Sequence, residues 1–241
     1  MKRIRELDDP RRRILVQALS LGILSAGAPG LARAQVFGSR PAKLPAGQSI
    51  YRITGQVTVN DMPADLKTPI HPGDTVKTTK GSEVIFVVGA NAMIARGGST
   101  VVIERGGSGT SAIMSGLRML TGALLTVTRG TAMTVRATTG TIGVRGTGFY
   151  VEAEPDQTYF CTCYGEADVA SNAEPRKTET ITAQHHDRPV YILNAPGGGN
   201  IRNAPFINHT DPELELIETL VGRTPPFVFP KDAYTAPRRT Y

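Results

Sequence analysis

The chain has 241 residues, of which 40% are hydrophobic, so it can bury a core and is more apolar than a disordered chain. Its formal charge of +6 is concentrated near the N-terminus, because residues 1–34 hold seven of the 27 basic residues and three of the 21 acidic ones. The remainder carries 20 basic and 18 acidic residues, which argues against the broad basic surface of a nucleic-acid-binding protein.

Residues 1–34 have the three parts of an export signal. A basic head is followed by an apolar middle, and an Ala-Arg-Ala exit precedes Gln35. The pair Arg11-Arg12 is similar to a twin-arginine signal. The apolar middle is shorter than the roughly 20 residues of a bilayer span, and we find no other candidate membrane segment. We therefore expect cleavage before Gln35 and a mature protein in the bacterial periplasm or outside the cell.

Residues 48–193 alternate between short apolar runs and turns that contain Gly, Asn, Asp or Pro. Runs such as SIYRITGQVTVND, TAMTVRATTG and TYFCTCYG are typical of strands, and turn signals recur about every 8 to 12 residues. This rhythm predicts an all-β fold, a sandwich or rolled sheet of short strands. A short helix stays open as an alternative around residues 110–120, TSAIMSGLRML.

Residues 194–241 change to one short C-terminal helix and a proline-rich tail. The stretch HTDPELELIETLVGR predicts a helix with Asp211 as N-cap, a proline in the first turn and a glycine as the stop signal. Leu214, Ile217 and Val221 would line one face, so we expect the helix to dock on the sheet.

The stretch TTGTIGVRGTGFYVEAEPDQTYFCTCYGEADVAS resembles the FecR domain, which is named for the iron-dicitrate transport regulator. The family's T-x-T-I-G-V-R-G-T-x-F element corresponds to Thr139–Phe149, and its next strand ends at Gly165. The resemblance implies a FecR-like β domain over residues 48–193 that contacts a protein partner of the cell envelope. Sigma-factor control does not carry over, because an export signal that starts near residue 1 leaves no room for a cytoplasmic anti-sigma segment.

The only two cysteines of the chain, Cys161 and Cys163, lie one residue apart in TYFCTCYG. Residues two apart on a strand face the same side, with Cα atoms about 6.5 to 7 Å apart at a rise of about 3.3 Å per residue. A disulfide between them would be strained. Two exposed thiols would become oxidised in an oxidising compartment, so we expect something to occupy or shield them.

Histidines are expected opposite the cysteines. If the two strands that flank the polar turn SNAEPRK form an antiparallel hairpin, the numbers of opposite residues sum to about 348. Cys163 then faces His185 and Cys161 faces Asp187, and a slip of one residue brings in His186 instead. Thiolates and imidazoles bind zinc, copper or iron. The candidate metal ligands are therefore Cys161, Cys163, His185 and His186.

Other interpretations stay open. Two cysteines can serve as small buried apolar side chains, and a histidine pair at a strand end can be solvated. His71 and His209 are expected to be structural or surface residues. No nucleophile–base pair is evident, so a hydrolase ranks third. The sequence favours a non-enzymatic, exported binding or sensing module with an envelope protein as partner, and as the alternative a metal-binding or redox-active β domain.

Overall fold

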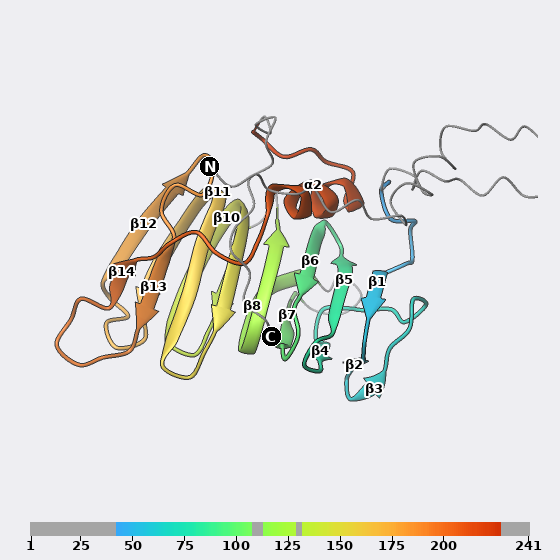
Figure 1. Ribbon diagram of the computed structural model, residues 1–241, viewed down its shortest axis with the longest axis horizontal. Coiled ribbons are helices and arrows are strands. Elements are labelled where there is room, and N and C mark those ends of the chain that lie inside the picture. The colour runs from blue at the N-terminus through green and yellow to red at the C-terminus, as the bar shows by residue number, and fades with distance from the viewer. Residues whose placement is uncertain (1–41, 108–112, 129–131, 228–241) are drawn as a thin grey trace, which may run out of the picture. The chain divides into compact units, whose positions relative to one another are not determined.

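The computed structural model describes residues 42–107, 113–128 and 132–227, which form strands and one helix (Figure 1). The expected export signal lies outside these residues. Within them, no helix has both the length and the apolar character needed to cross a membrane. The elements are β1 (Ile50–Thr54), β2 (Val57–Val59), β3 (Met62–Pro63), β4 (Thr75–Thr78), β5 (Glu83–Val88), β6 (Asn91–Ala95), β7 (Thr100–Gly106), β8 (Ile113–Val127), β9 (Ala132–Arg136), β10 (Gly140–Ala153), β11 (Gln157–Ser171), β12 (Thr178–Ala183), β13 (Val190–Leu193), β14 (Ile201–Asn203) and α2 (Asp211–Leu220).

The described strands belong to one sheet, which confirms the all-β prediction. Its main path is β14-β13-β11-β10-β9-β8-β7-β4-β2-β3, and β1, β5, β6 and β12 attach to it. The long strands change partners along their length: β8 pairs first with β7 and β9, then with β6 and β10. A strand that changes partners in this way turns the sheet back toward itself, so residues from distant strands meet in one core.

The helix considered around residues 110–120 is wrong for the described part, because β8 occupies it from Ile113 onward. Met114 and Leu117 are both buried, a spacing that also fits one face of a helix. The pairing explains this spacing: a register shift between Glu104 and Arg105 of β7 marks a bulge that leaves an extra residue of β8 between Met114 and Gly116.

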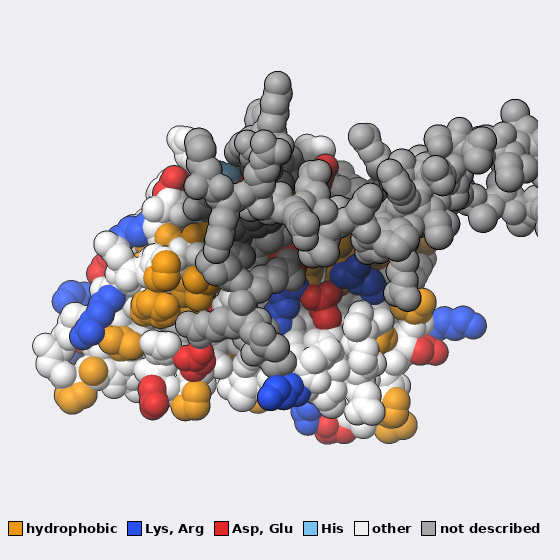
Figure 2. All heavy atoms as spheres, viewed as in Figure 1, with side chains coloured by type: hydrophobic (Ala, Val, Ile, Leu, Met, Phe, Trp, Pro, Cys, Tyr) orange, Lys and Arg blue, Asp and Glu red, His pale blue; other side chains and the backbone are white. Residues whose placement is uncertain are grey.

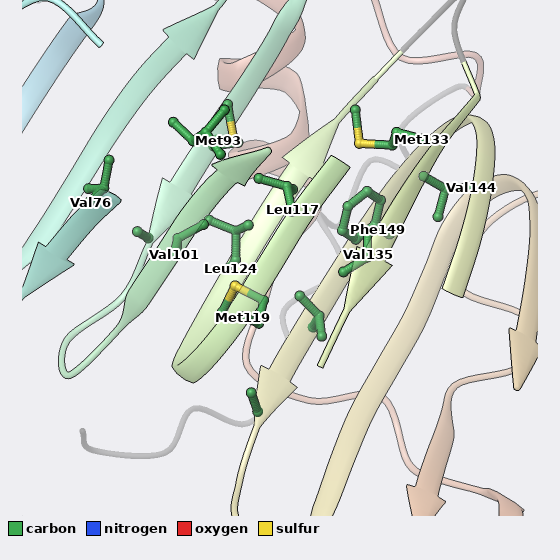
Figure 3. Close-up of a cluster of buried hydrophobic side chains, with 14 of the residues drawn as sticks. Val76, Met93, Val101, Leu117, Met119, Leu124, Met133, Val135, Val144 and Phe149 are labelled. Atoms are coloured by element: carbon green, nitrogen blue, oxygen red, sulfur yellow. The ribbon is translucent and has the colours of Figure 1, made fainter. Parts of the chain in front are cut away.

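Apolar side chains gather on both faces of the sheet. Because neighbours on a strand point to opposite faces, Leu124 and Leu125 belong to different clusters. The larger one, here called the inner cluster, brings together Leu124, Val101 and Phe149 from different strands (Figure 3). The smaller one, here called the outer cluster, contains Ile85, Ile94, Leu125, Tyr150, Cys161, Cys163, Leu214, Ile217 and Leu220.

Helix α2 covers the outer cluster, as the sequence predicts. Leu214 and Ile217 are fully buried, whereas Val221 is the half-buried C-cap and Leu220 takes the third buried position. The helix begins one residue earlier than predicted, since Thr210 is the N-cap and its N–H donates to Glu213 Oε2 at 3.0 Å. Asp211 is instead the first helical residue, and its carboxylate contacts histidine side chains.

A buried arginine connects α2 to the sheet. Arg96 follows β6 and is 5% exposed, and its guanidinium bonds Glu83 Oε2 at 2.5 Å and Glu213 Oε1 at 2.7 Å. Burial alone would lower the pKa of Arg96, but the charges of Glu213 and Glu83 outweigh it and raise this pKa. Removing one of the two glutamates would leave the charge of Arg96 buried without full compensation. The ion pair between Arg96 and Glu213 therefore fixes where α2 docks.

On the face that Figure 2 shows, basic side chains of the described residues are interspersed with acidic ones.

Between β13 and β14 the chain makes an open loop. Gly197, Gly198 and Gly199 have φ values of 100°, 90° and 67°, which only glycine adopts readily.

Candidate metal centre

Cys161 and Cys163 lie side by side on β11 and point to the same face, as the two-residue period of a strand predicts. Both thiols are free and fully buried in the outer cluster. The strand pairing places Tyr150 of β10 opposite Cys161. The cysteines therefore occupy the part of the sheet that α2 and the chain before it cover.

His186 reaches the cysteines from the connection between β12 and β13. Its N–H donates to Cys163 O at 3.0 Å, and its Nδ1 lies 3.5 Å from Cys161 Sγ. Its φ of 55° is a left-handed conformation that a non-glycine residue adopts at a cost of about 1–2 kcal/mol. Residues held in such conformations concentrate at functional sites, which is consistent with a ligand role for this ring.

His209 completes the group from the chain just before α2. Its Nε2 lies 3.2 Å from His186 Nδ1, and its Nδ1 lies 2.7 Å from Ile207 O. One side-chain donor atom from each of Cys161, Cys163, His186 and His209 lies within 4.8 Å of the other three. Two sulfurs and two nitrogens thus converge from three separate parts of the chain.

The spacing of these atoms fits a tetrahedral ion. With zinc–sulfur bonds of about 2.3 Å and zinc–nitrogen bonds of about 2.0 to 2.1 Å, tetrahedral angles put two nitrogens about 3.3 Å apart and a nitrogen and a sulfur about 3.6 Å apart. The corresponding distances are 3.2 Å between the two imidazole nitrogens and 3.5 Å from His186 Nδ1 to Cys161 Sγ. Two separations within the group therefore match those of a tetrahedral zinc site, and all four donor atoms lie within 4.8 Å of one another.

The outer nitrogens of both rings have acceptors, which sets the tautomers. Ile207 O can only accept, so Nδ1 of His209 carries the proton and Nε2 presents a lone pair. Asp211 Oδ1 lies 3.2 Å from His186 Nε2, which places the proton there and leaves the lone pair on Nδ1. The two lone pairs then face each other across 3.2 Å. A cation between them removes the repulsion, and such outer partners are what metal-binding histidines ordinarily have.

The two thiols differ in acidity. Burial alone raises the pKa of Cys161, but a hydrogen bond from Cys163, together with the contacts to His209 and His186, outweighs burial and holds this pKa well below its usual value. Burial, with the hydrogen bond to Cys161 and the charge on it, raises the pKa of Cys163 well above its usual value. A thiolate is the form that binds metal, so the centre starts with one ligand ready and one still protonated.

His185 lies outside the four-residue group, with its side chain 29% exposed and its Nε2 2.9 Å from Asp211 Oδ1. With His186 and Asp211 it forms a second group of possible ligand atoms. Asp187 Oδ2 accepts the N–H of Gln184 at 2.6 Å within the turn. His71 is a surface residue with 70% of its side chain exposed, as expected.

His209 was expected to be structural or a surface residue, and it is fully buried within the group. The sequence has no local signal for its role, because its distance from Cys163 along the chain follows no ligand spacing. Only the path of the chain back over the sheet brings it to the cysteines.

Aromatic side chains close the centre. The rings of Tyr150 and His209 stack with centroids 4.5 Å apart, and Phe206 lies 4.3 Å from the ring of His186. The four candidate ligands are between 0% and 7% exposed. Four protein ligands in a closed apolar setting are the arrangement of a structural zinc site, since catalytic zinc sites keep one position for water or substrate.

Asp211 positions one ligand and offers a first test. It is fully buried, and its Oδ1 contacts the rings of both His185 and His186. Asp211→Asn should weaken metal binding about 10- to 100-fold, because the carboxylate no longer fixes the His186 tautomer. Competition with a chromophoric chelator measures the change. Asp187→Asn, in the neighbouring turn, is the matched control and should stay within about threefold of the unaltered protein. Equal affinities for both variants would remove Asp211 from the centre.

Comparison with known proteins identifies no family for this chain. No protein-family profile matches it, and no curated protein does. Two crystal structures of a candidate anti-sigma factor from Parabacteroides distasonis, at 1.65 and 2.50 Å resolution, are similar to it with TM-scores of 0.42. The sequences are 17% and 16% identical, and each match covers 54% of this chain and 58% of that chain. Similarity at this level establishes neither a family nor a function.

Proposed function

We propose that this protein is a non-enzymatic β-sheet module that holds one zinc ion with Cys161, Cys163, His186 and His209. The observation that carries the proposal is the pair of imidazole nitrogens that face each other at 3.2 Å with a buried thiol 3.5 Å from one of them. Copper(I) and iron also bind thiolates, but two thiolates with two imidazoles in a tetrahedral arrangement favour zinc. With four protein ligands, the ion stabilises the fold and leaves no open position for substrate.

Metal analysis of the purified protein tests this proposal. The full chain is purified without added metal or chelator, and elemental analysis is combined with native mass spectrometry. We expect about one zinc ion per chain and two thiols that react only after unfolding. Metal-free protein, with either a Cys161–Cys163 disulfide or two free thiols, would overturn the proposal.

The acidity of the thiols gives a prediction about protons. Because the pKa of Cys163 is raised well above its usual value and the pKa of Cys161 is lowered, Cys161 loses its proton at a lower pH than Cys163 does. Zinc binding should therefore release fewer than two protons from the pair near neutral pH, and the affinity should rise with pH. Calorimetry in buffers of different ionisation enthalpy counts the protons. Release of two protons, or of none, would contradict the unequal pair.

The second candidate function is the one that the sequence resemblance supports: an exported module that contacts an envelope protein. The FecR-like element Thr139–Phe149 lies at the start of β10, where a register shift follows Arg145 and Gly146 has a φ of 60°. Arg145 pairs with Asp168 at 3.1 Å and is well exposed. Metal binding would also protect two thiols in an oxidising compartment.

Cell fractionation with intact-mass measurement tests export, and a mature chain that starts well before Gln35 would contradict the proposed cleavage.

A further inference from the structure

The candidate ligands differ in how firmly the fold holds them. Cys161 and Cys163 lie on β11, which is hydrogen-bonded to β10 on one side and to β12 and β13 on the other. His186 is tied to the same strand through its N–H bond to Cys163 O. Separating these three ligands would mean breaking the hydrogen-bond ladder of the sheet.

His209 belongs to a part of the chain that contributes no strand to the sheet and carries a single β-bridge residue, Thr210. This part, here called the C-terminal segment, comprises residues 204–220. Backbone hydrogen bonds fasten its two ends to the rest of the described fold, from Ala204 N–H to Pro189 O at 2.8 Å and from Leu44 N–H to Leu220 O at 2.9 Å. Between these ends, side chains hold it, among them the apolar residues of α2 that are buried in the outer cluster.

We infer that exchange of the metal ion is controlled by detachment of the C-terminal segment from the sheet. The inference rests on the proposed function, since it requires an ion at the four ligands. These ligands are at most 7% exposed, so no chelator reaches the ion in the closed state. The C-terminal segment is the ligand-bearing part that can leave without disrupting the sheet, and local openings of this kind occur well below the free energy of global unfolding.

Detachment also changes the number of protein ligands that coordinate the ion. When the segment leaves, His209 leaves with it, and four ligands become three. The vacated position is then open to water or a competing ligand, as in zinc sites that exchange or catalyse. The buried state keeps the ion, and the detached state releases it, so the rate of release follows the population of the detached state.

The experiment weakens the attachment at a residue of α2 that is not itself a ligand. Ile217 is fully buried in the outer cluster. Ile217→Ala should speed zinc transfer from the loaded full-length protein to a chromophoric chelator about thirty-fold or more, which corresponds to about 2 kcal/mol at 1.4 kcal/mol per tenfold. The rate should not depend on chelator concentration once the chelator is in excess, because the ion leaves the detached state before the chelator captures it.

The matched control is Ile103→Ala, the same change in β7, where Ile103 is fully buried in the inner cluster. It should leave the transfer rate within about threefold of the unaltered protein. If both variants still hold about one zinc ion per chain and transfer it at equal rates, the inference is overturned. If Ile217→Ala does not fold, Ile217→Val is expected to give a change of about two- to twelve-fold. An unaltered protein that contains no zinc would instead overturn the proposed function.

Discussion

Replacing Cys161 and Cys163 together by serine is expected to lower the bound zinc from about one ion per chain to background. A serine hydroxyl stays protonated near neutral pH and is a poor zinc ligand, so the two imidazoles alone cannot hold the ion. Elemental analysis of variant and unaltered protein, purified side by side, gives the result. Circular dichroism must show strand content in both, because the inner cluster does not depend on the cysteines.

Two histidine variants sharpen this result. His209→Gln should lose the ion, while His185→Gln should keep it, because the side chain of His185 contacts Asp211 and lies outside the four-residue group. Both variants remove one imidazole from the same region of the fold, so each controls for the other. Loss of zinc in His185→Gln with retention in His209→Gln would show that the ligands are those first expected from the sequence.

Removing the ion is expected to lower the melting temperature by about 5 to 16 °C. An ion present at 100 to 1,000 times its dissociation constant stabilises the folded state by about 2.7 to 4.1 kcal/mol. For a domain of about 200 residues, each kcal/mol shifts the midpoint by roughly 2–4 °C. The loss stays below the ~10–16 kcal/mol of zinc-finger peptides, because the sheet here has a large apolar core of its own.

Scanning calorimetry with and without excess chelator measures the shift. The variant in which serine replaces both cysteines is the control, and its midpoint should not respond to chelator. Equal midpoints for the unaltered protein in both conditions would mean that the centre does not stabilise the fold. A chelator effect of the same size in the variant would point to a metal site elsewhere in the chain.

The sequence predicted the geometry around the cysteines from strand period alone. The hairpin of β11 and β12 pairs Ala167 with Ile181 and Gly165 with Ala183, so the predicted sum of 348 is confirmed. The sum does not place His185 opposite Cys163, because β12 ends at Ala183 and the chain leaves the strand pairing before it reaches the histidines. Past the strand end, the two-residue rule no longer applies, and the left-handed conformation of His186 decides which ring turns inward.

Other features needed the tertiary structure. The burial pattern of β8 follows from a bulge, which the sequence does not mark. The place of His209 follows from the docking of α2, to which Arg96 contributes from a distant strand. Local rules of capping and periodicity find a helix and its buried face, but they do not say which strand that face will meet.

The glycine loop at residues 197–199 lies between the two parts of the chain that supply the ligands. Cys161, Cys163 and His186 precede it, and His209 follows it. With an ion bound, the centre is a cross-link between these two parts, comparable to a disulfide but reversible by chelation. Continuity of the chain through the loop would then be dispensable for keeping α2 in place. A chain cut there by a protease would remain cross-linked through the centre for as long as the ion is bound.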